Sequence, residues 1–233
     1  MLALVTGASK GIGRAIAKAL ANEGIDLVIN SRSLHDLTLL KSEILTIHPN
    51  LHIEIFAADI SVANEVDDLI DFIIQKNEPL DILVNNAGIY QPGMILDGPD
   101  GFLEQMMATN FYSIVRLTRG LLPKFIRQKS GYIFNMCSVA GLDPYPGGSL
   151  YCISKFALQG FSRCLREELK STGIKVSTIY PGATWSDSWK GVDLPEDRLM
   201  QADDVAQTII ASLKLSPSAV LEEIILRPQL GDL

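Results

Sequence analysis

The chain has 233 residues, of which 47% are hydrophobic and 20% are charged, and its formal net charge at pH 7 is −7. This length and composition predict one folded domain with a continuous apolar core, and no stretch is apolar over the length needed to cross a bilayer. The negative charge argues against nucleic acid or an anionic membrane as the main partner, because both bind basic surfaces.

The chain opens with an apolar run over residues 2–5, a glycine-rich turn over residues 6–13 and a helical pattern over about residues 13–23. Six further apolar runs follow, and helical segments separate most of them; the runs cover residues 27–30, 53–57, 82–84, 132–136, 176–180 and 220–226. This alternation predicts an α/β fold, a doubly wound seven-stranded parallel sheet with helices on both faces (Rossmann-type), in a single domain over residues 1–233. A ligand is expected beyond the carboxyl ends of the strands.

The glycine-rich turn is the first candidate binding site. Glycines let the backbone approach a pyrophosphate closely, and the helix amides that follow supply free donors and a partial positive charge. The spacing Gly7-xxx-Gly11-x-Gly13 departs from G-x-G-x-x-G, so dinucleotide binding follows here from mechanism and not from the exact pattern. The alternative is a glycine-rich helix entry without a ligand. The residues expected to bind the cofactor are Gly7, Ser9, Lys10, Gly11, Ile12 and Gly13.

The end of the second predicted strand indicates which dinucleotide binds. An Asp or Glu there would bind the ribose 2′-hydroxyl of NAD, but residues 29–33 read Ile-Asn-Ser-Arg-Ser. Arg32 can bind a 2′-phosphate through charge-assisted contacts, and Lys10 in the glycine turn can add a second cation. The two cations together predict NADP(H), although each alone is more often a solvated surface charge.

Two long helical stretches, about residues 102–127 and 151–170, carry apolar residues around much of their circumference. Such helices are either deeply buried or paired with a second subunit, which predicts a homodimer or homotetramer. Over residues 184–200 the periodicity breaks, and this segment, which directly follows a strand, is typical of a substrate lid.

Tyr151 and Lys155 stand at i and i+4 of a predicted helix and therefore project from the same face. A phenol with a pKa near ~10 is a weak acid or base at neutral pH, and an adjacent ammonium can lower that pKa. The pair therefore predicts proton transfer.

With the glycine turn, Asn85-Asn86-Ala87-Gly88, Ser138, Tyr151-xxx-Lys155 and Pro181-Gly182 in this order, the chain resembles the classical short-chain dehydrogenase/reductase family over essentially its full length. The resemblance implies that Tyr151 exchanges a proton with the substrate oxygen as hydride moves to or from the nicotinamide. It also implies that Lys155 lowers the tyrosine pKa and holds the nicotinamide ribose, that Ser138 binds the substrate oxygen, and that Asn110 supports a water-linked proton relay. The further cofactor residues that it implies are Asp59, Ile60, Asn86, Pro181, Gly182, Thr184 and Ser186, together with Tyr151 and Lys155 themselves.

The substrate is less closely defined. The end of the chain, from Glu222 on, and the context of Tyr151 resemble bacterial sepiapterin reductase-like members, which implies NADPH-dependent reduction of a ketone or diketone, such as a pterin side chain. An apolar slot for a pterin could come from Tyr90, Met94, Tyr145, Trp185 and Trp189, with a carboxylate from Asp143, Asp187 or Asp232; lid packing and loop capping explain the same residues.

Three alternatives stay open: a 3-oxoacyl-acyl-carrier-protein reductase, another small-ketone or alcohol oxidoreductase, and an NADP(H)-binding sensor without turnover. An acyl-carrier-protein substrate favours basic residues at the mouth of the site, but the predicted lid has only Lys190 and Arg198, which argues against this alternative. The sequence shows no metal-ligand spacing and no signal peptide at its start, so we expect a cytoplasmic enzyme without a metal, acting on a small-molecule carbonyl compound.

Overall fold

The computed structural model describes residues 1–186, 189 and 191–232. Its strands and helices alternate along the chain as the apolar runs predict. The strands are β1 (Leu2–Thr6), β2 (Asp26–Ser31), β3 (Ile53–Ala57), β4 (Ile82–Asn85), β5 (Gly131–Met136), β6 (Ile174–Pro181) and β7 (Glu223–Leu226). The helices are α1 (Gly11–Asn22), α2 (Leu34–Ile47), α3 (Ala63–Ile74), α4 (Phe102–Met107), α5 (Ser113–Gln128), α6 (Ser149–Leu169) and α7 (Ala202–Leu213), with short turns η1 (Ala108–Tyr112), η2 (Val139–Gly141) and η4 (Glu196–Arg198).

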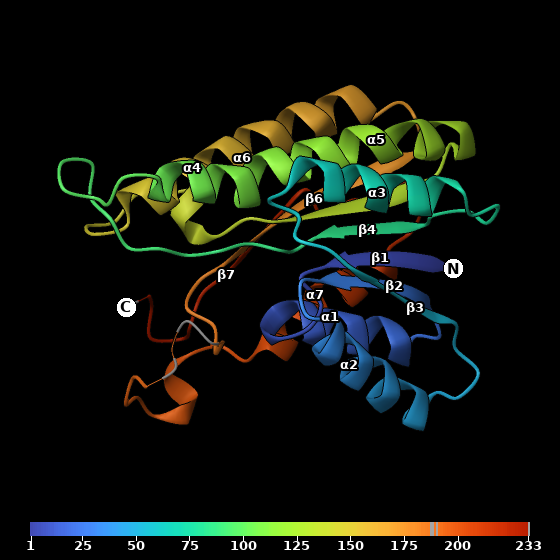
Figure 1. The fold of residues 1–233 in the computed structure, drawn as a ribbon, viewed down its shortest axis with the longest axis horizontal. Coiled ribbons are helices and arrows are strands. Elements are labelled where there is room, and N and C mark those ends of the chain that lie inside the picture. The colour runs from blue at the N-terminus through green and yellow to red at the C-terminus, as the bar shows by residue number, and fades with distance from the viewer. Residues whose placement is uncertain (187–188, 190, 233) are drawn as a thin grey trace.

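The sheet has the order β3-β2-β1-β4-β5-β6-β7, and every neighbouring pair is parallel. Helices α1, α2 and α7 cover one face, and α3, α5 and α6 cover the other (Figure 1). The predicted fold class is therefore confirmed. Because the order reverses between β1 and β4, the loops that follow these strands diverge and leave room for a ligand at the carboxyl edge.

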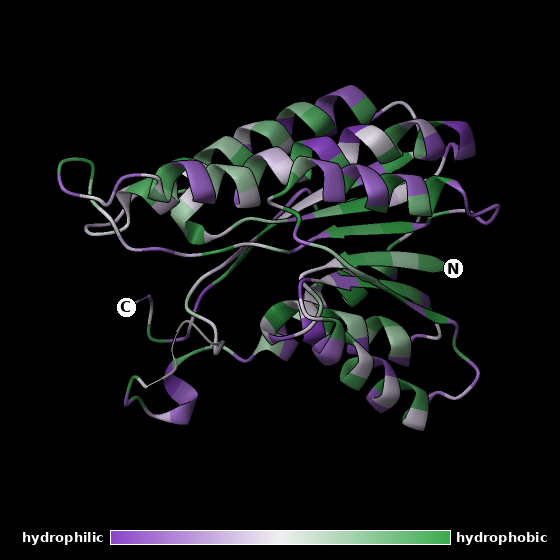
Figure 2. Ribbon diagram, in the orientation of Figure 1, coloured by the Kyte–Doolittle hydropathy of each residue, from purple (hydrophilic) through white to green (hydrophobic). Residues whose placement is uncertain are grey.

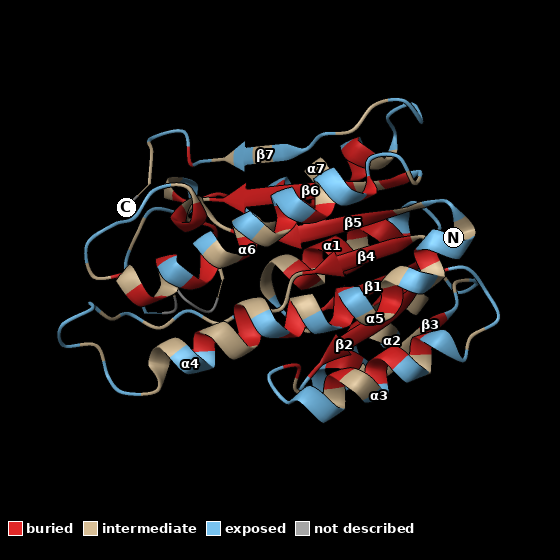
Figure 3. Ribbon diagram, turned by 90° about the horizontal axis from the view of Figure 1, so that it is seen from above, coloured by how far each residue is buried: buried red, intermediate tan, exposed pale blue. Residues whose placement is uncertain are grey.

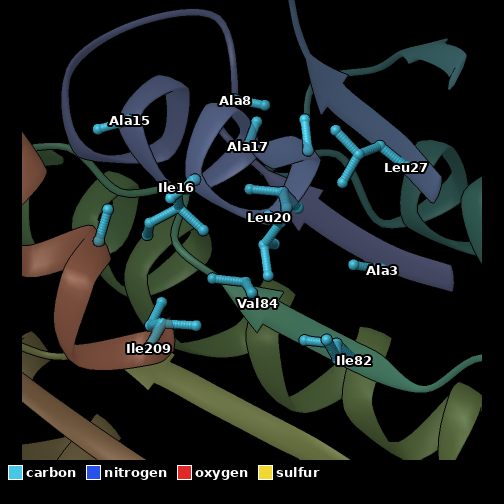
Figure 4. Close-up of a cluster of buried hydrophobic side chains, with 14 of the residues drawn as sticks. Ala3, Ala8, Ala15, Ile16, Ala17, Leu20, Leu27, Ile82, Val84 and Ile209 are labelled. Carbon is cyan, nitrogen blue, oxygen red and sulfur yellow. The ribbon is translucent and has the colours of Figure 1, made fainter. Parts of the chain in front are cut away.

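The core lies in two layers, one on each face of the sheet. Alternate side chains of β1 point to opposite faces, so Ala3 and Val5 join the cluster under α1 and α7, whereas Leu2 and Leu4 join the cluster under α3 and α5. Figure 4 shows the first cluster, with Ile16 and Leu20 of α1 near Val84 of β4. Both faces are covered, which explains why the central strands read as continuous apolar runs (Figure 2).

Most element boundaries lie within two residues of the expectation, and two elements differ more. The last strand begins at Glu223 and not at residue 220, and as an edge strand it stays largely exposed (Figure 3). The helical stretch over residues 102–127 is three pieces, because the π-helical turn η1 interrupts it between α4 and α5. Among the described helices, none is both long and apolar enough to cross a membrane.

Candidate functional site

Two adjoining cavities lie at the carboxyl edge of the sheet, with volumes of about 590 and 650 Å³. The first extends from the glycine turn to the ends of β2 and β3, and the second from the end of β5 to α6 and the segment after β7. They share five lining residues, so a single elongated ligand can occupy both. The shared residues are Ile12, Asn86, Gly88, Ile89 and Ser186.

The glycine turn forms one wall of the first cavity. Gly7 and Gly11 have φ of +64° and +53°, a left-handed conformation that glycine adopts at little cost. Asn86 fastens the turn to the end of β4, because its Nδ2 donates to the carbonyls of Thr6 at 2.9 Å and Gly7 at 3.2 Å. The backbone amides at the start of α1 are therefore held beside open space.

The space around the glycines of the turn also suits an anionic cofactor. A Cβ on Gly13 would lie 2.3 Å from the carbonyl oxygen of Gly7 and 2.4 Å from Asn86 Nδ2, so only glycine allows this close packing. A Cβ on Gly11 would find its nearest atom 3.7 Å away, so that part of the turn borders open space. Close backbone approach beside unpaired helix amides is what a pyrophosphate requires.

The other end of the first cavity carries the residues expected at the adenosine. Lys10, Arg32, Asp59 and Ile60 all line it, and the Arg32 side chain is 71% exposed, with Nη1 3.9 Å from Asp59 Oδ2. Asp36, in the first turn of α2, also lines the cavity, and the reasoning from residues 29–33 missed it. Two carboxylates, Asp36 and Asp59, thus line the same cavity as the two cations.

The second cavity brings together Ser138, Tyr151 and Lys155, as predicted. Lys155 Nζ donates to the carbonyl of Met136 at 3.0 Å and lies 5.7 Å from the centre of the Tyr151 ring. The Tyr90 ring packs edge-on against Tyr151, with 5.1 Å between ring centres. The tyrosine ring is therefore held in orientation by the contact with Tyr90 and lies near the ammonium.

The pKa values of the pair correct one expectation. Burial raises the pKa of Tyr151, and a hydrogen bond with Ser138 opposes that rise in part, so the pKa lies above its ordinary value and not below it as expected. Burial also lowers the pKa of Lys155, because the desolvated ammonium is costly. In this arrangement Tyr151 is a protonated donor at neutral pH.

Asn110 lies in η1, fully buried beside the cavities. Its Oδ1 accepts from the amide of Ile89 at 2.8 Å, and its Nδ2 donates to the carbonyl of Ile89 at 2.9 Å and to Ser154 Oγ at 3.0 Å. The π-turn thereby ties the loop after β4 to α6, next to Lys155. The water-linked relay expected of Asn110 stays a prediction.

The remaining predicted residues divide into three groups. Pro181, Gly182, Thr184 and Ser186 line the second cavity, as do Tyr90, Tyr145, Trp189, Asp143 and Asp232. Trp185 and Met94 are wrong as slot residues, because neither lines the cavity; the Trp185 indole donates to the carbonyl of Glu196 at 2.7 Å. Asp187 and Lys190 lie outside the described residues.

The base of the predicted lid over residues 184–200 is closed by main-chain bonds. Thr184 and Met200 form a β-bridge, the amide of Trp185 donates to Met200 O at 2.9 Å, and the amide of Met200 donates to Ala183 O at 3.1 Å. Movement of this segment over a substrate stays a prediction. Within the described ranges, no group of three or more His, Cys, Asp and Glu side chains could hold a metal ion.

Comparisons with known proteins agree with this geometry. A family model described as short chain dehydrogenase matches residues 1–197. An uncharacterized oxidoreductase of Staphylococcus epidermidis is 30% identical over 227 residues, which cover 97% of this chain and 96% of the relative. A sepiapterin reductase of Chlorobaculum tepidum is 33% identical over 238 residues, covering 99% of this chain and 97% of that enzyme. The crystal structure of a metagenomic short-chain oxidoreductase in complex with NADP is 28% identical, covers 98% of this chain and 97% of that chain, and superposes with a TM-score of 0.84.

Proposed function

The chain belongs to the short-chain dehydrogenase/reductase family, and we propose that it is an NADPH-dependent reductase of small ketones or diketones. The observation that carries the proposal is the convergence of Ser138, Tyr151 and Lys155 in a cavity that joins the glycine-turn cavity. A nucleotide bound along the first cavity would end beside these three side chains.

The residues of the first cavity are those that would hold NADPH. The amides of the turn and of the α1 N-terminus suit the pyrophosphate, and Lys10 and Arg32 suit the 2′-phosphate. Asp59 and Ile60 would contact the adenine; Asn86, Pro181, Gly182, Thr184 and Ser186 would border the nicotinamide half. When bound, NADPH supplies a hydride to the carbonyl carbon.

The side chains of the second cavity handle the proton. Tyr151 is a phenol that is protonated at neutral pH, and burial raises its pKa further; it donates its proton to the carbonyl oxygen. Ser138 donates a hydrogen bond to the same oxygen and fixes its distance from the phenol. Lys155 is buried beside the tyrosine ring and stabilises the phenolate that remains after the transfer. Asn110 holds the wall behind Lys155.

A diketone on a flat ring system, such as a pterin side chain, is the substrate that we favour. Tyr90, Tyr145 and Trp189 give the second cavity an aromatic wall, and the relative from Chlorobaculum tepidum is named a sepiapterin reductase. An acyl-carrier-protein substrate fits less well, because Arg198, the described lid cation, already donates to the carbonyls of Gly231 and Asp232.

A substrate panel tests the proposal. With NADPH, the enzyme is expected to reduce small diketones and sepiapterin, and NADH is expected to support much slower turnover. NADPH oxidation is followed for diketones, sepiapterin and an acetoacetyl thioester. Selective turnover of the thioester would favour the acyl-carrier-protein alternative, and tight NADPH binding without turnover of any carbonyl would favour the sensor.

Arg32→Ala is expected to raise the Kd for NADPH about tenfold and to leave the Kd for NADH unchanged, because a charge-assisted contact with the 2′-phosphate contributes about 1.5 kcal/mol or more. Titration of cofactor fluorescence measures both constants. Arg127→Ala is the control, because it removes the same charge at the exposed end of α5, away from the cavity. It should change neither the Kd for NADPH nor the Kd for NADH. An equal loss of affinity for NADPH and NADH in Arg32→Ala would show that Arg32 does not bind the 2′-phosphate.

We also propose that the enzyme is a homodimer or homotetramer. Apolar and aromatic side chains are exposed on η1, α5 and α6, where a second copy would cover them. They are Tyr112, Ile126, Ile153 and Phe156.

A further inference from the structure

Three charged side chains from separate segments meet in one wall of the second cavity. Asp143 belongs to the loop between η2 and α6, whereas Arg227 and Asp232 belong to the segment after β7. The Arg227 guanidinium binds the Asp232 carboxylate through Nη1, and its Nη2 lies 3.5 Å from Asp143 Oδ2. None of the three takes part in the proton transfer proposed above.

The cluster is held in place by the backbone around it. Arg198 donates to the carbonyls of Gly231 at 2.9 Å and Asp232 at 3.4 Å, so it ties residues 227–232 to the segment before α7. The amide of Ala183 donates to Asp232 Oδ1 at 3.4 Å. A Cβ on Gly182 would lie 2.2 Å from that same oxygen, so the carboxylate packs directly against the end of β6.

The charge of this wall is negative. Two carboxylates and one guanidinium leave one negative charge, and the guanidinium is already shared between both carboxylates. Among the described residues that line the cavity, Lys155 is the one further charged group; it lies beside Tyr151, with its Nζ on the carbonyl of Met136, so the negative charge is local to the cluster. Asp232 already accepts from Arg227 and from the amide of Ala183, whereas the Asp143 carboxylate is 79% exposed and has one long contact with Arg227, so a substrate group that reaches the cluster meets an accessible acceptor in Asp143.

We propose that Asp143, Arg227 and Asp232 form a charge-selective specificity site that determines which carbonyl compounds the enzyme reduces. The site accepts substrates whose body carries an ammonium, amidine or other group of N–H donors, and it rejects those that carry a carboxylate or phosphate. Arg227 holds the two carboxylates in position and limits their repulsion. This inference rests on the reductase activity proposed above.

Three substrates that share a 2,3-diketone end and differ at the other end test the proposal: one ends in a primary ammonium, one in a hydroxyl and one in a carboxylate. In the wild type, kcat/KM for the ammonium compound is expected to exceed that for the carboxylate compound about tenfold, as a partly exposed charge contact allows. In Asp143→Asn/Asp232→Asn the guanidinium keeps its charge while both carboxylates lose theirs, so the ratio is expected to fall below one.

The control is Glu167→Gln/Glu168→Gln, which removes two negative charges at the exposed far end of α6 and should keep the wild-type ratio. Should the double Asn variant fail to fold, Asp143→Asn alone is used, because the Asp143 side chain is 79% exposed, and the ratio should fall severalfold. The proposed specificity site, but not the reductase activity, would be overturned by either of two results. In the first, the enzyme reduces the hydroxyl compound and has equal kcat/KM for the ammonium and carboxylate compounds; in the second, it prefers the carboxylate compound. No turnover of any of the three would overturn the reductase proposal.

Discussion

Tyr151→Phe is expected to lower kcat for carbonyl reduction by about 10²- to 10⁴-fold, because it removes the general acid and keeps the aromatic ring. The phenylalanine ring can keep the edge-on contact with Tyr90, whose ring centre lies 5.1 Å away, and Lys155 can keep its bond to the carbonyl of Met136. The Kd for NADPH should therefore stay close to that of the wild type. Single-turnover measurement of NADPH oxidation, with cofactor binding titrated separately, distinguishes loss of chemistry from loss of binding.

The pH profile gives an independent readout of the same group. Because burial raises the pKa of Tyr151, the phenol stays protonated through the neutral range, and the rate of reduction should be flat there and fall only at alkaline pH, as the proton donor is lost. The Phe variant should lack that alkaline fall. Tyr112→Phe removes a hydroxyl from a tyrosine on η1 that lines neither cavity, keeps the ring for the proposed subunit contact, and should match the wild type in rate and profile. Near-normal turnover by Tyr151→Phe would mean that another group supplies the proton.

The sheet and its order of elements were predictable because the central strands are buried on both faces and so appear as apolar runs. The start of the edge strand was predicted three residues too early, at residue 220. This strand is largely exposed, with Ile225 54% exposed, so its sequence carries no clear pattern of buried residues that would mark where it begins. The break at η1 was missed for another reason. Asn110 is held there by Ile89 and Ser154, and contacts that distant in sequence leave no periodic signal.

The site residues also differ in whether local sequence or the tertiary fold brings them together. Residues within one turn of helix or one loop, such as Tyr151 with Lys155 or the glycine turn, are set by local geometry and could be inferred from their spacing. Arg227 could not, because its partner Asp143 lies far from it along the chain, and only the fold brings the two together. The raised pKa of Tyr151 also depends on burial by the tertiary structure, which the spacing of Tyr151 and Lys155 does not reveal.

Gly13→Ala is expected to destabilise the protein by about 3 kcal/mol and to weaken NADPH binding, because the added methyl group has no space. In an open helix the change from Gly to Ala gains about 1 kcal/mol, but here the Cβ would meet Gly7 O at 2.3 Å and Asn86 Nδ2 at 2.4 Å. These are the atoms that fasten the turn to β4, so relief of the collision must displace the amides that face the pyrophosphate. Gly11→Ala, with 3.7 Å of space but φ of +53°, should lose only about 1 kcal/mol to backbone strain. Urea unfolding at matched protein concentration and titration with NADPH measure both variants, and equal losses in stability would show that strain, and not the collision at Gly13, determines the sequence of the turn.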